Sequence, residues 1–144
     1  MGTAGQSDQQ PATGGPAARL RLEPGNLVQE LGWDEDCDDE LRAAIEDLTG
    51  NELVDEEASE VADVVLLWWR DGDGDLVDAL VDATADLVDG GSVWLLTPKV
   101  GRDGHVDPAD VADAAPTAGM STTTTLSIAE DWIATRLVAP RSGR

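Results

Sequence analysis

Hydrophobic and polar positions along this chain follow two periods, and the clearest pattern lies in residues 61–100. Residues 64–69 form a continuous run of valine, leucine and tryptophan, which is typical of a strand covered on both faces of a parallel sheet. Asp75 is positioned to cap a following helix, and the glycine pair at 90–91 is expected to stop it. Residues 92–96 then form a second buried strand. The connection is long enough for the right-handed crossover of parallel strands.

The segment before this unit predicts a strand, a helix and a short second strand. Residues 26–31 suit a strand that Gly32 ends. The next helix has an acidic first turn and ends at Gly50. Its apolar stripe has helical spacing and consists of Leu41, Ala44, Ile45 and Leu48. Leu53 and Val54 indicate a short strand.

The segments after residue 75 predict two helices and a hairpin. Apolar residues continue at helical spacing as far as Val88, so the helix after Asp75 is expected to reach the glycine pair. Its outer face carries Asp78, Asp82 and Asp86. Asp107 and the proline after it open another helix, which Pro116 is expected to close. Residues 122–128 and 133–138 are rich in β-formers and predict a terminal antiparallel hairpin.

Together these elements predict one three-layer, Rossmann-like α/β domain over residues 20–141, with a mainly parallel sheet and a C-terminal antiparallel hairpin. The chain has 144 residues, of which 41% are hydrophobic, which is enough for one core but not for two. Residues 1–19 are rich in small and polar residues, so we expect a disordered tail there, and a disordered end at residues 142–144.

The charge of the chain restricts its partners. The formal net charge is -21, from 30 acidic and 9 basic residues, which argues against nucleic acid and anionic membranes as ligands. The segment from Asp34 to Glu60 holds thirteen carboxylates and one base, Arg42. A solvated face is the plain interpretation of this segment, and a docking surface for a basic protein partner is the alternative.

Cysteine content and hydropathy bear on the compartment. The single cysteine, Cys37, excludes an internal disulfide and a multi-cysteine metal site, and suits a reducing cytoplasm. The N-terminus lacks the apolar core of a signal peptide, and no apolar run approaches the roughly 20 residues of a membrane helix. We therefore expect a cytoplasmic protein.

The first candidate site is a ligand site at the carboxyl ends of the strands, where doubly wound sheets bind their ligands. The turn after the first strand offers one glycine, Gly32, followed by Trp33 and Asp34. The glycine-rich nucleotide signature is missing, although an uncharged or cationic ligand remains open. A second loop supplies Lys99 and Arg102, which could hold an anionic group while tryptophan stacks on a planar ligand. Pairing of this basic loop with the acidic residues 71–75 is the alternative.

The second candidate site is a calcium loop. Asp71, Asp73 and Asp75 alternate as in the first half of such a loop, with Asp82 at the twelfth position. However, Leu76 replaces the glycine needed at the sixth position. A flexible strand-to-helix turn with a capping aspartate, which needs no metal, is therefore the favoured interpretation of these residues.

Long segments of the chain resemble a known family. These are residues 27–36 (LVQELGWDED), 65–75 (VLLWWRDGDGD), 94–102 (WLLTPKVGR) and 115–119 (APTAG). They are similar to the uncharacterised bacterial domain-of-unknown-function 3052 family, particularly its actinomycete branch, over roughly residues 20–141. The resemblance implies a small Rossmann-like sheet similar to methyltransferases, without an established activity, ligand or cofactor.

The order of the elements is also similar to a shortened class I methyltransferase. Such enzymes bind their cofactor through a glycine-rich turn after the first strand and an acidic residue after the second. Gly32 keeps a trace of the first feature and Asp55 resembles the second.

We therefore expect a non-catalytic protein-interaction or regulatory module on a methyltransferase-like scaffold, with no catalytic residues assigned and any cofactor unknown. His105 has no acid or nucleophile partner that would make a catalytic triad. A small-molecule sensor or an enzyme at the carboxyl edge is the first alternative, and a calcium-binding protein the second. Oligomeric state is left open.

Overall fold

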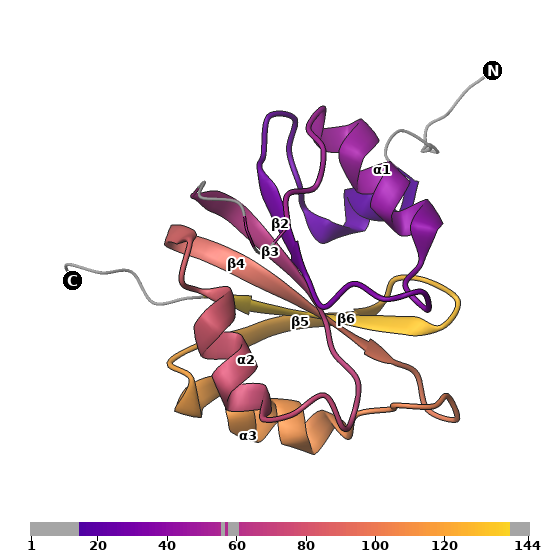
Figure 1. The fold of residues 1–144 in the computed structure, drawn as a ribbon, viewed down its shortest axis with the longest axis vertical. Coiled ribbons are helices and arrows are strands. Elements are labelled where there is room, and N and C mark those ends of the chain that lie inside the picture. Colours follow the sequence, from indigo (N-terminus) through magenta and orange to yellow (C-terminus); the bar gives the residue numbers. More distant parts are fainter. Residues whose placement is uncertain (1–14, 56, 58–60, 139–144) are drawn as a thin grey trace.

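The computed structural model describes residues 15–55, 57 and 61–138, which form an α/β fold around one twisted sheet (Figure 1). In chain order the elements are the 3-10 helix η2 (Gly15–Leu20), β2 (Val28–Leu31), α1 (Asp39–Thr49), β3 (Ala62–Trp68), α2 (Leu76–Ala83), β4 (Leu87–Pro98), α3 (Pro108–Thr117), β5 (Ser121–Ser127) and β6 (Trp132–Val138). None of the helices within this described part is long and apolar enough to cross a membrane.

The sheet has five strands in the order β2-β3-β4-β6-β5. The three strands β2, β3 and β4 are parallel, whereas β6 runs antiparallel to both β4 and β5. The predicted second strand is reduced to one parallel bridge between Val54 and Gln29 on the outer side of β2. The predicted fold class is confirmed, including the terminal hairpin.

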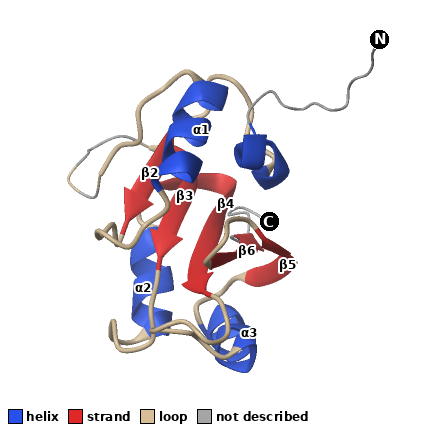
Figure 2. Cartoon of the chain, turned by 90° about the vertical axis from the view of Figure 1, so that its right-hand side faces the viewer, coloured by secondary structure: helices blue, strands red, loops and turns tan. Residues whose placement is uncertain are grey.

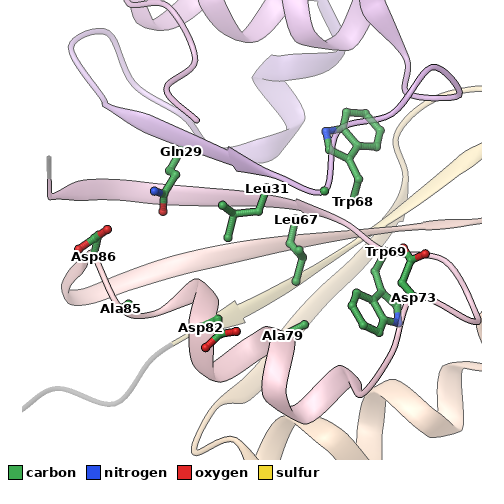
Figure 3. A pocket seen from close by; sticks show the side chains of 11 residues that line it. Gln29, Leu31, Leu67, Trp68, Trp69, Asp73, Ala79, Asp82, Ala85 and Asp86 are labelled. Carbon is green, nitrogen blue, oxygen red and sulfur yellow. The ribbon is translucent and has the colours of Figure 1, made fainter. Parts of the chain in front are cut away.

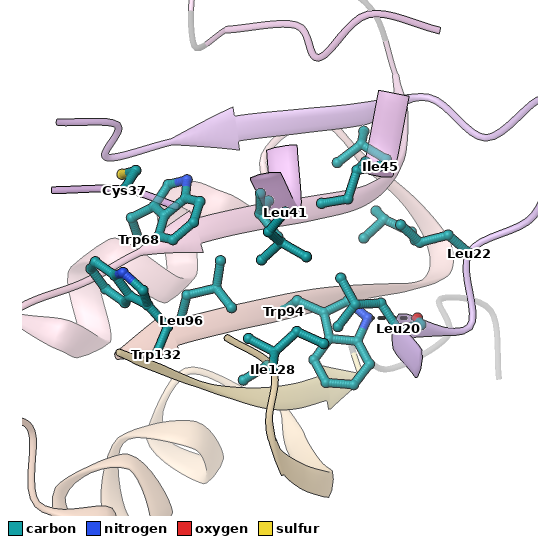
Figure 4. Close-up of a cluster of buried hydrophobic side chains, with 14 residues drawn as sticks. Leu20, Leu22, Cys37, Leu41, Ile45, Trp68, Trp94, Leu96, Ile128 and Trp132 are labelled. Carbon is teal, nitrogen blue, oxygen red and sulfur yellow. Dashed lines mark hydrogen bonds between the residues drawn. The ribbon is translucent and has the colours of Figure 1, made fainter. Parts of the chain in front are cut away.

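Helices cover the two faces of this sheet unequally (Figures 1 and 2). Alternate residues of β3 point to opposite faces and are buried on both, as the continuous apolar run predicted. On one face Leu66 and Trp68 pack with η2 and α1, where the predicted stripe residues Leu41 and Ile45 are fully buried (Figure 4). On the other face Val65 packs with α2 and α3.

The helix ends follow the capping chemistry that the sequence predicted. Asp38 accepts a hydrogen bond from the Leu41 backbone N–H at 2.9 Å, and Gly50 ends α1 with a φ of 79°. Asp75 caps α2 by accepting from the Asp78 N–H, and Asp107 caps α3 by accepting from the Ala109 N–H. These caps fix where each strand-to-helix loop turns back over the sheet.

The prediction that the helix after Asp75 continues to the glycine pair is wrong. Helix α2 ends at Ala83, and β4 begins at Leu87, where Leu87 pairs with Ala62 of β3. A Cβ at Gly91 would lie only 2.7 Å from the side chain of Leu87. The register between β3 and β4 also shifts at this point. The glycines therefore lie in the irregular first part of β4 and do not end a helix. Residues 87 and 88 have helical apolar spacing, but the pairing of Leu87 with β3 places them in the strand.

Two other boundaries differ from expectation. Helix α3 continues through Pro116 to Thr117, because the proline lies in the last turn. Residues 15–19, expected in the disordered tail, belong to η2, whose Leu20 is buried and accepts a hydrogen bond from the Trp94 indole at 2.9 Å. The rest of the expected tail (1–14) and the expected end (142–144) lie outside the described residues.

Candidate functional site

Arg70 lies at the carboxyl edge of the sheet, two residues after Trp68 at the end of β3. Its Nε donates to Asp36 Oδ2 at 3.0 Å and its Nη2 donates to Asp36 Oδ1, which makes a bidentate ion pair. Its Nη1 donates to the Gly32 carbonyl at 2.8 Å. Arg70 thus ties the loop after β3 to the loop after β2.

Two tryptophan side chains pack beside this ion pair. The Arg70 guanidinium lies over the ring of Trp132, 5.4 Å from its centroid. Trp132 packs edge-on against Trp68 with the ring centroids 4.8 Å apart, and its indole N–H donates to the Asp36 carbonyl at 3.3 Å. The side chain of Arg70 is only 14% exposed, so the arginine is a partly buried, paired cation and not a free surface cation.

Two glycines allow the loops after β2 and β4 to lie close to the end of β3 and to Arg70. A Cβ at Gly32 would collide with the Trp68 carbonyl oxygen, and Gly32 has a φ of +78°. A Cβ at Gly104 would lie 2.9 Å from the Cβ of Arg70. Both positions therefore favour glycine, because an added Cβ would clash with Trp68 or with Arg70.

The electrostatics of the edge follow from this pairing. Hydrogen bonds from Arg70 lower the pKa of Asp36 below its usual value, although partial burial opposes the change. Burial acts to lower the pKa of Arg70, but the hydrogen bonds and charge of Asp36 outweigh it and raise that pKa. Burial raises the pKa of the neighbouring Cys37 thiol to about 11. The edge thus holds a permanent ion pair beside a protonated, unreactive thiol.

A second cluster of polar and aromatic side chains surrounds Glu30 on β2. Glu30 is buried and accepts two hydrogen bonds from Arg42, at 2.6 and 2.9 Å, and one from the Trp68 indole at 2.9 Å. These hydrogen bonds raise the pKa of Arg42. Arg42 also lies 5.7 Å from the ring centroid of Trp33. The carboxylate of Glu30 is therefore fully engaged within the protein.

Two of the four predicted ligand-binding residues, Trp33 and Arg102, border different cavities. Trp33 is 52% exposed and borders a cavity of about 260 Å³ that Asp55 and Glu57 also line. Arg102 pairs with Asp131 at 3.4 Å and borders a different recess, of about 30 Å³. That recess has roughly the volume of one water molecule.

The other two predicted residues make local backbone contacts. The Lys99 N–H donates to the Asp131 carbonyl at 3.0 Å, and the Asp34 N–H donates to Cys37 Sγ at 3.3 Å. The basic loop thus pairs through Arg102 with the turn before β6. It meets the acidic loop after β3 through the Asp71 N–H, which donates to the Gly104 carbonyl.

The residues of the predicted calcium loop have other partners. Asp73 Oδ2 accepts from the Arg70 N–H at 3.0 Å, and Asp75 caps α2. No group of three or more metal-ligating side chains converges within the part of the chain that the structure describes. The capping interpretation accounts for Asp75.

A trough of about 590 Å³ lies on the sheet face between β2 and α2 (Figure 3). Its apolar lining includes Leu31 and Leu67 from the strands and Ala79 from the helix. Its carboxylates are Asp73, Asp82 and Asp86. Figure 3 shows Asp82 and Asp86 on the helix side, opposite Gln29 and Leu31 of β2. Sequence patterns did not predict this trough.

Sequence reasoning also missed Arg70, Asp36 and Trp132. The available signal was that Arg70 directly follows the strongest strand, at the edge where loops converge. Asp36 is 34 positions from Arg70 in the sequence, and Trp132 is 96 positions from Asp36, so no local pattern connects them.

Comparison with protein families matches residues 17–141 to a family model described as a protein of unknown function, DUF3052. Uncharacterised proteins of Mycobacterium bovis and of two Mycobacterium tuberculosis strains are 56% identical to this chain over 126 residues, which covers 88% of this chain and 79% of each relative.

Among solved structures, the chain is similar to the pyocyanin biosynthetic protein PhzM, with a TM-score of 0.62 at 14% identity, covering 88% of this chain. It spans about half (54%) of PhzM's length. A SAM-dependent methyltransferase from Aquifex aeolicus gives a TM-score of 0.54 at 13% identity, covering 85% of this chain and 88% of the enzyme. These likenesses show a methyltransferase-like, Rossmann-like fold.

Proposed function

The chain belongs to the DUF3052 family of proteins of unknown function, and from that premise we propose that it is a cytoplasmic, non-catalytic interaction or regulatory module on a methyltransferase-like scaffold. The observation that carries the proposal is the bidentate Arg70–Asp36 pair, which links the loops after β2 and β3 across the carboxyl edge. Ligands of open α/β sheets bind at that edge.

The packing of the edge further supports this proposal. Arg70 is held by the Gly32 carbonyl and by the face of Trp132 in addition to Asp36. Opening the edge for a cofactor would leave a mostly buried guanidinium without its partners, which is costly. The lone free cysteine, buried at position 37, is consistent with a reducing compartment.

The partner surface in this proposal is the acidic face, Asp34 to Glu60. Among its described residues, Glu40 and Asp47 on α1 and Glu52 after it are exposed. Their charge favours a basic protein, because complementary potentials speed encounter and discriminate between partners.

Calorimetric titration with S-adenosylmethionine and S-adenosylhomocysteine tests the closed edge. We expect no binding heat at millimolar ligand, since the Arg70–Asp36 pair ties together the two loops between which a cofactor would bind. A dissociation constant below about 100 μM, which corresponds to more than about 5 kcal/mol of binding free energy, would contradict the proposal.

Photo-crosslinking in cells tests the interaction role. A photoreactive amino acid at Glu40 or Asp47 should form adducts with a protein partner, while the same group at exposed Thr123 on β5 provides the control. If no position on the acidic face crosslinks above the Thr123 control, that face is not the partner surface.

A small-molecule sensor is the second candidate function, favoured by the 260 Å³ cavity beside Trp33. Asp55 and Glu57 at this cavity suit a planar cation that stacks on the indole. A thermal-shift screen of cationic heteroaromatic compounds tests it: a shift that Trp33→Ala abolishes would support a sensor, and a flat screen would remove it.

A further inference from the structure

The trough between β2 and α2 runs along the sheet face and reaches the carboxyl ends of β2 and β3, where Gly32, Trp68 and Trp69 belong to its lining. Helix α1 and η2 cover the opposite face of β2. On the trough side, Gln29 and Leu31 of β2 face a cavity of about 590 Å³ beside α2. Among the described residues, this face of β2 is therefore not covered by a helix.

The shape of the trough matches an elongated occupant. Its lining extends from Asp73, before the start of α2, to Asp86, after its end. Since α2 has eight residues, the trough is at least about 12 Å long at the α-helical rise. Two or more turns of a helix would fit beside α2 and complete that layer.

The chemistry of the trough specifies the charge of the occupant. Its described lining combines an apolar floor, including Leu31, Leu67 and Ala79, with the carboxylates of Asp73, Asp82 and Asp86. No lysine or arginine belongs to that described lining. An apolar stripe flanked by lysine or arginine is complementary to such a surface.

We propose that this trough is a docking site for a basic amphipathic helix of a partner protein, which packs beside α2 against β2. The inference rests on the interaction role proposed above and assigns it a docking site separate from the acidic face.

Peptide binding to the full chain tests the site. The probe is a labelled peptide of about 14 residues, long enough for nearly four turns, with leucine at helical spacing and lysine elsewhere. A scrambled peptide of the same composition controls for charge alone. Fluorescence anisotropy should show tighter binding of the amphipathic peptide by about tenfold or more, because only its apolar stripe fits the floor.

Matched variants of α2 locate the binding. Ala79→Arg fills the trough, whereas Val81→Arg adds the same charge to an exposed position of the same helix outside the trough lining. We expect Ala79→Arg to weaken the amphipathic peptide at least about tenfold, and Val81→Arg less than about threefold. Thermal melting verifies that both variants fold.

A second pair keeps the test decisive if Ala79→Arg does not fold. Asp82→Asn removes a trough carboxylate, and Asp78→Asn removes an exposed one from the same helix. Weakening by Asp82→Asn beyond that by Asp78→Asn supports the trough. Equal weakening by both members of either pair, equal binding of the scrambled peptide, or no binding at millimolar peptide overturns the proposal.

Two further arms separate other occupants. Tighter binding of spermidine than of the peptide, abolished by Ala79→Arg, would assign the trough to a small polycation and overturn the helix. Sedimentation showing a dimer that Ala79→Arg dissociates would assign it to a second copy. In either case, crosslinks at Glu40 would still support the interaction role. If the trough binds the peptide but Glu40 forms no crosslinks, only the acidic face is ruled out as a partner surface.

Discussion

At the scale of single residues, the closed edge depends on glycine conformation as much as on charge. Gly32 and Gly104 allow the loops after β2 and β4 to approach Trp68 and Arg70. Gly32 combines a positive φ with backbone contact, whereas Gly25 has a positive φ of 92° and no atom within 4 Å of the point where a Cβ would lie. Comparing the two positions therefore separates the effect of a positive φ from the effect of close backbone contact.

Gly32→Ala should therefore destabilise the protein more than Gly25→Ala. A left-handed conformation alone costs a non-glycine residue about 1–2 kcal/mol. The collision with the Trp68 carbonyl adds strain, so we expect a loss of about 3 kcal/mol or more for Gly32→Ala. Urea denaturation of both variants measures the difference. Equal losses would show that backbone conformation, and not close approach, selects glycine at position 32.

At the scale of secondary-structure elements, local interactions determine where α2 begins, and long-range strand pairing determines where it ends. Asp75 starts the helix by capping, as the sequence predicted. Its end depends on β3, because Ala62 and Leu87 pair across strands and the Ala62 N–H donates to the Asp86 carbonyl at 2.7 Å. The helical pattern of residues 87 and 88 is overridden by that pairing.

Substitution of Asp75 distinguishes its capping role from calcium binding. Asp75→Ala should lower the free energy of unfolding by about 1 kcal/mol, since the Asp78 N–H loses its acceptor. Asp75→Asn should leave stability nearly unchanged, because asparagine caps as well as aspartate. Thermal melts with and without millimolar calcium complete the test. A calcium-dependent rise in melting temperature that Asp75→Asn abolishes would favour the metal site.

At the scale of the whole molecule, the net charge of -21 opposes compaction through self-repulsion. Three of the seven described lysine and arginine side chains form ion pairs within the protein: Arg42 with Glu30, Arg70 with Asp36, and Arg102 with Asp131. The remaining carboxylates repel one another at a range that salt screens.

Sodium chloride should therefore stabilise the fold. Raising its concentration from about 20 to 300 mM should increase the melting temperature by roughly 2–4 °C, equivalent to about 1 kcal/mol for a chain of this size. The increase should shrink near pH 5, closer to the isoelectric point of about 4.1. A salt effect that is absent at pH 7, or larger at pH 5, would show that self-repulsion does not limit stability.

Much of the fold is predictable from the sequence because its signals are local. The apolar run of residues 64–69 predicted a buried strand, and Asp75, Asp107 and Gly50 predicted helix ends. Each signal involves residues within about four positions of one another, so hydrogen bonding and burial of a short segment suffice. The fold class and the family resemblance were confirmed on this basis.

The candidate site could not be predicted in the same way. The Arg70–Asp36 pair, its support by Trp132 and the trough between β2 and α2 all join residues from separate elements. Likewise, Trp33 and Arg102 border different cavities although both follow strand ends. Periodicity determines which residues a strand or helix buries, whereas the order of strands in the sheet determines which loops meet. That order arises from long-range packing, and with it the closed edge and the uncovered sheet face.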